Sequence, residues 1–239
     1  MTRRITVLTL LLLAGLAVQA QPRYDYSRLT TERLDRGVVA VRQADGRVFI
    51  SWRILREDPK GLGFDIYRNG TRLNAEPLTQ GGSCYIDAQP LPGDARYEVK
   101  AVGSQESMAK GCFMLSADAP AGYLPVRLQK PFDGQTPDGR RYSYSANDAT
   151  VADVDGDGQY EIILKWDPSN AHDNAHDGFT GPTLFDCYRL NGERLWRIDM
   201  GRNIRSGAHY VPFIVYDLDG DGRAELMVKT ADGTRDAAG

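Results

Sequence analysis

A nine-residue acidic motif occurs twice in the chain and restricts the possible folds more than any other feature of the sequence. The copies occupy residues 153–161 and 217–225, so the second starts 64 residues after the first. Each copy has carboxylates at positions 1, 3, 5 and 9 and glycines at positions 4 and 6. Carboxylates this crowded repel one another unless a hard cation lies among them, and Ca²⁺ accepts roughly six to eight oxygen ligands. We therefore expect each loop to bind Ca²⁺.

The predicted calcium ligands are the acidic side chains of each loop and the backbone carbonyl at position 7, because the glycines let the chain wrap tightly around an ion. They are Asp153, Asp155, Asp157, Gln159 and Glu161 in the first loop, and Asp217, Asp219, Asp221, Arg223 and Glu225 in the second. The alternative is a solvated acidic turn without metal. Two copies with identical spacing argue against that alternative.

The residues that follow each loop indicate strands. An EF-hand has a bidentate Glu at position 12, where this chain has Leu164 or Val228, so helix-loop-helix and dockerin-like arrangements are disfavoured. A repeated unit of strands fits a β-propeller blade. The expected strands are 149–153, 160–166, 184–190, 194–200 and 210–216, with a hairpin turn at Asn191-Gly192. A closed ring takes at least about four blades, so residues 126–239 are expected to be the first one or two blades of a longer protein.

The preceding residues predict a second all-β domain. Between residues 37 and 102, apolar and polar positions alternate in short segments separated by turn residues, as in 48–54, 64–66 and 97–101. This pattern predicts a small β-sandwich, and the hairpin Asn69-Gly70 and the approach to Tyr97 resemble fibronectin type III modules. The expected domains are thus a sandwich with its linker at 21–125 and a partial propeller at 126–239.

The N-terminus predicts export. Arg3 and Arg4 precede an apolar run at 5–16 and small residues that end at Ala20, which is typical of a signal peptide cleaved after Ala20. The run is shorter than the roughly 20 residues that a membrane span needs. We expect a secreted or periplasmic monomer without a membrane span.

Charge and cysteine content add little to this prediction. The formal net charge is −3 and no basic cluster stands out, which argues against a nucleic-acid partner. The chain has three cysteines, and pairing of Cys84 with Cys112 after export stays open beside buried thiols.

The second half is similar to secreted bacterial rhamnogalacturonan lyases of polysaccharide lyase family eleven, and the likeness extends back over the sandwich. It rests on the segments SANDA at 145–149, VADVDGDG at 151–158, LKWDPSN at 164–170, LWRID at 195–199, GRNIRSGAHY at 201–210 and KTADGT at 229–234. The resemblance implies an eight-bladed calcium-binding propeller behind the sandwich. It also implies an enzyme that cuts rhamnogalacturonan I, an acidic polysaccharide of the plant cell wall, between rhamnose and galacturonate by β-elimination. By the same resemblance, Asn147 and Asp167 contact the sugar and Asp148 binds a further Ca²⁺.

β-Elimination requires a cation that neutralises the uronate carboxylate and a base that takes the adjacent proton. The weak candidates are Lys165, Lys229, Arg202, Arg205 and His209. The two arginines lie beside glycines near a predicted strand end and are also candidates for contact with carbohydrate or a carboxylate. Each also has a structural explanation: Lys165 and Lys229 occupy the same repeat position on a strand, and His209 can pack beside Tyr210. The base and the choice between endo and exo cleavage therefore stay open. The alternative function is a non-catalytic, calcium-stabilised propeller that binds carbohydrate or a protein partner.

Overall fold

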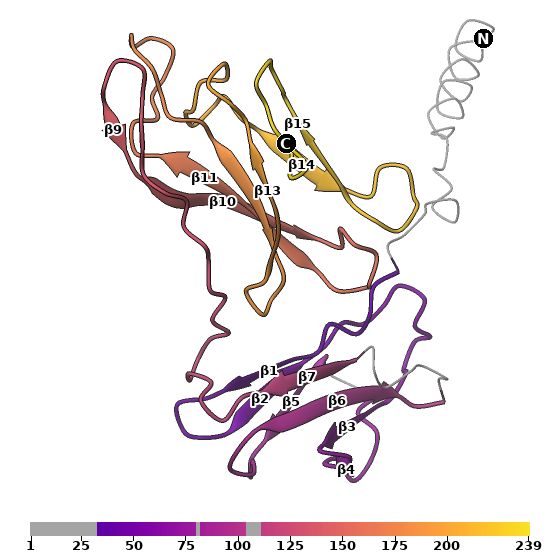
Figure 1. The fold of residues 1–239 in the computed structure, drawn as a ribbon. Coiled ribbons are helices and arrows are strands. Elements are labelled where there is room, and N and C mark those ends of the chain that lie inside the picture. Colours follow the sequence, from indigo (N-terminus) through magenta and orange to yellow (C-terminus); the bar gives the residue numbers. More distant parts are fainter. Residues whose placement is uncertain (1–32, 80–81, 104–110) are drawn as a thin grey trace, which may run out of the picture. The chain divides into compact units, whose positions relative to one another are not determined.

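The structure, a computed structural model, describes residues 33–79, 82–103 and 111–239. The predicted signal peptide lies outside the described residues. In the described ranges all regular structure is β, and every strand pairing within a sheet is antiparallel (Figure 1). A search of the same ranges for a helix able to cross a bilayer finds none. The prediction of an all-β protein is confirmed.

The N-terminal part consists of two antiparallel sheets that share one hydrophobic core. The first has the order β1 (Val39–Arg42), β2 (Val48–Ser51), β5 (Cys84–Asp87), and the second β4 (Thr71–Arg72), β3 (Phe64–Arg68), β6 (Ala95–Ala101), β7 (Cys112–Leu115). Ile50 from the first sheet and Ile66 and Tyr97 from the second belong to the same buried cluster, and all three are 0% exposed. Alternation along each strand places these side chains on the inner face.

Two details of this part differ from or extend the sequence prediction. The strand expected to run through Ile54 ends at Ser51, because the chain turns where the Asp58 amide donates to the Leu55 carbonyl, and Ile54 is 60% exposed. No disulfide joins Cys84 on β5 to Cys112 on β7. The predicted turn at Asn69-Gly70 is confirmed: both residues have positive φ, which the hairpin between β3 and β4 requires.

The C-terminal part is built around one four-stranded meander. Its order is β10 (Tyr144–Ala152), β11 (Glu161–Pro168), β12 (Leu184–Tyr188), β13 (Arg194–Asp199), and the pairs β8 (Gly134–Gln135) with β9 (Arg141–Tyr142) and β14 (Phe213–Tyr216) with β15 (Glu225–Val228) form two further small sheets (Figure 1). The four strands predicted for the meander are confirmed within a few residues at each end, except that β10 starts five residues earlier than expected. The closed propeller stays a prediction.

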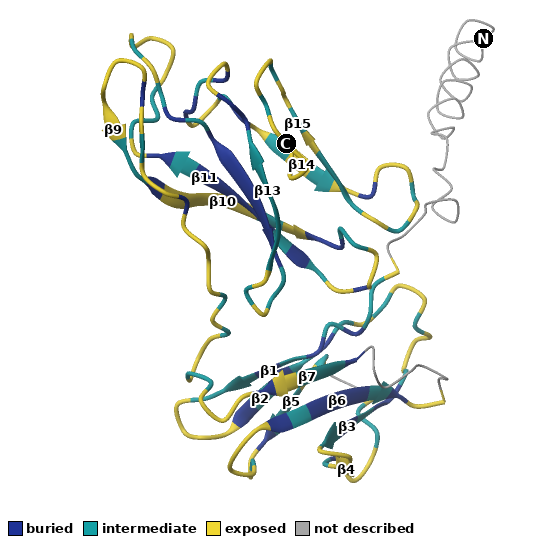
Figure 2. Ribbon diagram, viewed as in Figure 1, coloured by how far each residue is buried: buried dark blue, intermediate teal, exposed yellow. Residues whose placement is uncertain are grey.

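Strand β11 is buried along most of its length, and its apolar residues Ile163, Leu164 and Trp166 pack on both faces of the sheet (Figure 2). On one face Ile163 packs in a cluster that includes Phe185 of β12 and reaches Phe213 of β14. On the other face Leu164 and Trp166 belong to a second cluster. Strand β10, by contrast, is largely exposed, and only its two ends are buried. The polar side chains of β10 therefore lie exposed at this edge of the meander.

A buried ionic network at Asp186 fastens three strands of the meander. The Asp186 side chain is 0% exposed and accepts from Arg197 Nε at 2.6 Å on Oδ1 and from Arg197 Nη2 at 2.6 Å and Trp166 Nε1 at 2.8 Å on Oδ2. The hydroxyl of Tyr188 donates to the same carboxylate. A buried carboxylate is tolerated when its lone pairs are filled in this way, so the network fixes the register of β11, β12 and β13.

Candidate functional site

The first acidic loop connects β10 to β11 and is shaped by its own carboxylates. Asp153 is 1% exposed, and its two oxygens accept from the amides of Gly156 at 2.7 Å and Gly158 at 2.8 Å. Both glycines have positive φ, which lets the amides turn inward. Glu161, the first residue of β11 and also 1% exposed, accepts from the Val154 amide at 3.0 Å. The loop is thus preorganised around two buried carboxylates.

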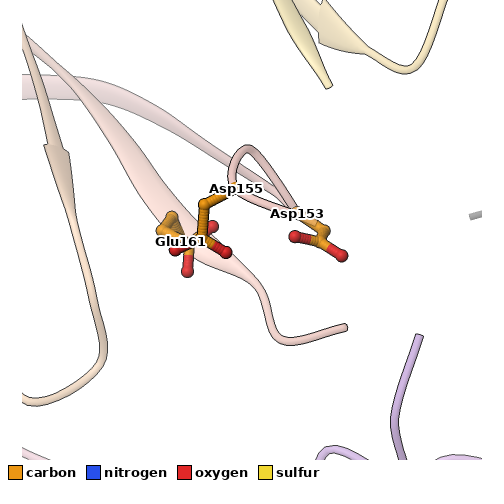
Figure 3. A group of neighbouring side chains, drawn as sticks. All are labelled: Asp153, Asp155 and Glu161. Atoms are coloured by element: carbon orange, nitrogen blue, oxygen red, sulfur yellow. The ribbon is translucent and has the colours of Figure 1, made fainter. Parts of the chain in front are cut away.

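Three carboxylates converge in this loop. Asp153, Asp155 and Glu161 each offer an oxygen within 4.8 Å of the others, with Asp153 and Asp155 on the loop and Glu161 on the strand (Figure 3). Burial raises the pKa of Asp153, and burial together with the neighbouring aspartates raises the pKa of Glu161 to about 7. Like charges held together out of water are costly without a counter-charge. These residues therefore fit a hard cation, and the cluster could hold a metal ion.

The second loop repeats this construction between β14 and β15. Asp217 accepts from Gly220 at 2.7 Å and Gly222 at 3.0 Å, and Glu225 accepts from Leu218 at 2.8 Å. Asp217, Asp219 and Glu225 likewise bring their oxygens within 4.8 Å of one another. The two loops adjoin, since the Ala224 amide donates to the Asp153 carbonyl at 2.7 Å. The absence of flanking helices in this described region agrees with the prediction that the loops join strands.

Some predicted ligands lie outside these two groups. Asp157 and Asp221, at position 5, are not in the clusters, and each accepts from the amide two residues later, that of Gln159 or Arg223, at 2.8 Å. Ligation by these two aspartates and by the carbonyls of Gln159 and Arg223 stays a prediction. The sequence analysis missed Arg189, which donates to Asp155 Oδ2 at 2.6 Å. No spacing rule signals this contact, because it joins the end of β12 to a loop 34 residues away.

The residues expected to contact sugar surround a buried lysine at the exposed edge of the meander. The register of β10 with β11 shifts between Ala146 and Ala149, so Asn147 and Asp148 form an irregularity opposite Lys165. Lys165 is 2% exposed, and its Nζ lies 3.5 Å from Asp148 Oδ2 and 3.8 Å from Asp167 Oδ1. Asp167 points to the same face as Lys165 because it lies two residues further along β11.

This arrangement leaves Asp167 incompletely satisfied. Its Oδ1 is buried and accepts no hydrogen bond from any described residue. Burial raises its pKa; Lys165 acts in the opposite direction and Asp148 in the same direction as burial. A buried carboxylate oxygen without a donor is suited to a hydroxyl group of a ligand. Asn147 is exposed in the irregularity of the neighbouring strand β10, whereas ligation of metal by Asp148 stays a prediction.

The candidates for base or neutraliser lie in different settings. Lys165 is on a strand as expected, but Lys229 follows β15 and is exposed. The side chain of His209 is 82% exposed, with Nδ1 4.0 Å from Asp173 Oδ2, so it does not pack as the structural explanation suggested. Arg205 is half-buried against His172, and Arg202 is exposed. The structure therefore distinguishes buried Lys165 and half-buried Arg205 from the exposed cations.

Taken together, the antiparallel sheets and the twin acidic loops define an all-β protein in which strand-connecting loops can hold metal ions. Residues 123–239 match the family described as "Rhamnogalacturonan lyase family 11, C-terminal domain", and residues 29–112 match "Rhamnogalacturonan I lyases beta-sheet domain". The chain belongs to rhamnogalacturonan lyase family 11.

Similar proteins cover this chain almost completely. It is 47% identical over 240 residues to the rhamnogalacturonan endolyase YesW of Bacillus subtilis, covering 99% of this chain and 37% of YesW. It is 51% identical over 210 residues to the exolyase YesX of the same organism, covering 87% of this chain and 33% of YesX. The crystal structure of YesW matches with a TM-score of 0.78 and 51% identity over 88% of this chain and 35% of that chain. A solved structure of a Bacillus licheniformis rhamnogalacturonan lyase matches with a TM-score of 0.78 and 50% identity over the same shares. The chain thus spans about a third of the length of these relatives.

Proposed function

We propose that this chain acts in the cleavage of rhamnogalacturonan I between rhamnose and galacturonate by β-elimination. The observation that carries this proposal is the sequence identity of about half, over nearly the whole chain, to proteins named rhamnogalacturonan endolyase and exolyase. The edge of the meander supports it, because the exposed Asn147 on β10 and the Asp167 oxygen without a donor on β11 lie on paired strands there.

In this reaction a base removes the proton from C5 of galacturonate, and the electron pair forms a C4–C5 double bond as the glycosidic oxygen leaves C4. We assign Asn147 and Asp167 to hydrogen bonds with sugar hydroxyls. Lys165 is assigned a charge-neutralising role, because its Nζ is buried between Asp148 and Asp167 and is not presented to a substrate. Its ammonium offsets two carboxylates that would otherwise repel an anionic polymer.

The metal that we propose for the two loops is Ca²⁺. Three convergent carboxylates in each loop are the oxygen ligands that Ca²⁺ prefers, and the buried, hydrogen-bonded state of Asp153 and Glu161 favours a site built into the fold. When bound, Ca²⁺ supplies positive charge that offsets the carboxylates and fixes the connections between strands. We also propose that the meander is one blade of a propeller and that the protein is exported, on the pattern of Arg3, Arg4 and the apolar run that follows.

Incubation of the full chain with rhamnogalacturonan I tests the lyase function directly. The unsaturated uronate formed by elimination absorbs in the near ultraviolet, so absorbance should rise with time. Products without a double bond would indicate hydrolysis and contradict the proposal. Asp167→Asn is the matched variant, since it keeps the shape of the side chain and removes the charge that faces Lys165.

A non-catalytic carbohydrate-binding function is the second candidate. It is favoured by one observation: Lys165, the candidate cation next to Asp167, is 2% exposed and ion-paired. Calorimetric binding of rhamnogalacturonan oligosaccharides without any gain in near-ultraviolet absorbance would support this candidate over the lyase.

A further inference from the structure

The segment that follows β13 is fastened to the long loop between β11 and β12. Ser206 is 0% exposed, and its hydroxyl donates to the Gly181 carbonyl at 2.7 Å while its amide donates to Thr180 Oγ1 at 3.0 Å. The His172 amide donates to the Ser206 carbonyl at 3.0 Å. These bonds hold the backbone of Arg205 against the loop, so its side chain starts from a fixed position.

The guanidinium of Arg205 has neutral partners. Its Nη1 lies 2.6 Å from His172 Nε2, and its Nη2 donates to the Gly178 carbonyl at 3.0 Å. His172 Nδ1 lies 2.7 Å from the Asn170 carbonyl, which can only accept, so Nδ1 carries the proton. Nε2 is then the acceptor for Arg205, and the imidazole in this arrangement is neutral. Neither partner offsets the positive charge of the arginine.

Arg205 forms no ion pair within the described ranges. No carboxylate there lies within 4.0 Å of its guanidinium. Asp173, on the same loop, instead accepts from the Tyr210 hydroxyl at 2.7 Å. A half-buried cation loses hydration without a Coulombic return until an anion arrives. A planar guanidinium held in a fixed orientation matches a carboxylate, which it can bind through two parallel hydrogen bonds.

Arg205 belongs to the same end of the meander as Asp167. The loop that carries His172 follows β11 directly, and Asp167 is the penultimate residue of that strand. The segment that carries Arg205 follows β13, whose last residue pairs with Leu184 at the start of β12. Register therefore places the cation at the end of the sheet where β11 finishes, and not at the end that bears the first acidic loop.

We propose that Arg205 binds the carboxylate of a uronate unit at this end of the sheet and that His172 positions it. The inference rests on the proposed function, because the uronate is then the galacturonate of rhamnogalacturonan. Arg205 contacts the ligand, whereas His172 acts only through Arg205 by accepting its hydrogen bond.

The test compares an acidic ligand with its neutral counterpart by calorimetry of the full chain. The ligands are a rhamnogalacturonan oligosaccharide and the same oligosaccharide with its carboxyl groups reduced to alcohols. Arg205→Gln should raise the Kd of the acidic ligand by roughly 10- to 100-fold, the value of a charge-assisted bond, and leave the Kd of the reduced ligand unchanged. Arg127→Gln is the matched control, because it removes the same charge from an exposed residue beside the Gly192 turn, at the opposite end of the sheet. Equal losses for both ligands, or an equal loss in Arg127→Gln, would overturn the proposal.

Two variants at His172 test its positioning role. His172→Phe removes the acceptor and should raise the Kd of the acidic ligand while leaving that of the reduced ligand unchanged. His172→Gln supplies an amide oxygen as acceptor and should restore part of the affinity. Unchanged affinity in His172→Phe would remove His172 from the proposal.

A separate measurement keeps the failure of the proposed function distinguishable from the failure of this site. In protein labelled with ¹⁵N-arginine, the Nε–H resonance of Arg205, assigned with Arg205→Gln, should shift on addition of free galacturonate and not of galactose. If this shift occurs but the chain binds no rhamnogalacturonan, the carboxylate site stands and the proposed function fails. If galacturonate leaves the resonance in place, the carboxylate site is refuted whatever the polysaccharide does.

Discussion

Removing divalent cations should make the protein less stable as the pH rises, because Glu161 is then buried without a counter-charge. Its pKa is raised from the ordinary 4.5 to about 7 in the metal-free fold. Between these values the folded state binds more protons at Glu161 than the unfolded state, so the free energy of unfolding falls as pH increases. The loss begins near the unfolded pKa and is complete above the folded one. A bound cation keeps Glu161 ionised throughout and abolishes this dependence.

The size of the effect follows from the shift. At about 1.4 kcal/mol per pKa unit, a rise of this size corresponds to at most about 3.5 kcal/mol, and water that enters the metal-free loop reduces it towards roughly 2 kcal/mol. The pKa of Asp153 is raised in the same direction. For a chain of this length, 2 kcal/mol corresponds to a change in Tm of about 4–8 °C.

Thermal unfolding between pH 5 and pH 8, with a chelator or with millimolar Ca²⁺, measures this effect. The chelated protein should show a Tm that decreases with pH, and Ca²⁺ should raise the Tm most at the alkaline end. Glu161→Gln should remove much of the slope in chelator, whereas Glu76→Gln, which removes an equal charge from an exposed position, should retain it. An unchanged slope in Glu161→Gln, or a Tm in chelator that rises with pH, would refute the electrostatic account of the loop.

Three further substitutions test other parts of the structure. Asn147→Ala should raise the Kd for rhamnogalacturonan oligosaccharides by roughly 5- to 30-fold without lowering the Tm, since the side chain is exposed; a wild-type Kd would contradict its role. Asp186→Ala should lower the free energy of unfolding in urea by about 3–5 kcal/mol, because it leaves the Arg197 guanidinium without its carboxylate partner; a loss below about 1 kcal/mol would show that the network is not structural. Gly181→Ala should cost about 1–3 kcal/mol, as a Cβ there would lie 2.6 Å from the Tyr142 ring, and the cost should fall when Tyr142 is also changed to Ala; equal costs in both backgrounds would exclude the clash.

The sequence predicts those features whose cause is local. Turn chemistry marks Asn69-Gly70 and Asn191-Gly192, and acidic spacing identifies both loops, because their hydrogen bonds connect residues within a few positions. The early start of β10 could not be found in this way. Residues 144–148 are mostly polar and read as a loop, yet residues 144–146 pair with β11, because the strand is an exposed edge that needs no apolar pattern.

Contacts between residues far apart in the sequence could not be predicted either. The contacts of Asp186 depend on the register between three strands, and the contact of Arg205 with His172 joins residues 33 apart. The sequence offers one sign of the Asp186 network: this single acid lies inside the otherwise apolar strand at 184–188, and a buried carboxylate needs a partner. The convergence of Lys165 with Asp148 likewise depends on the irregularity in β10, which no spacing rule predicts.

The backbone hydrogen bond from the Ala224 amide to the Asp153 carbonyl couples the conformations of the two acidic loops. The residue before Glu225 holds the carbonyl of the first acid in the other loop, so the order of one is transmitted to its neighbour through a single amide. The two loops should consequently bind cations cooperatively, so that an ion in one loop lowers the cation concentration needed to fill the other. Because such coupling is reciprocal, a change that disorders either loop should weaken cation binding in both.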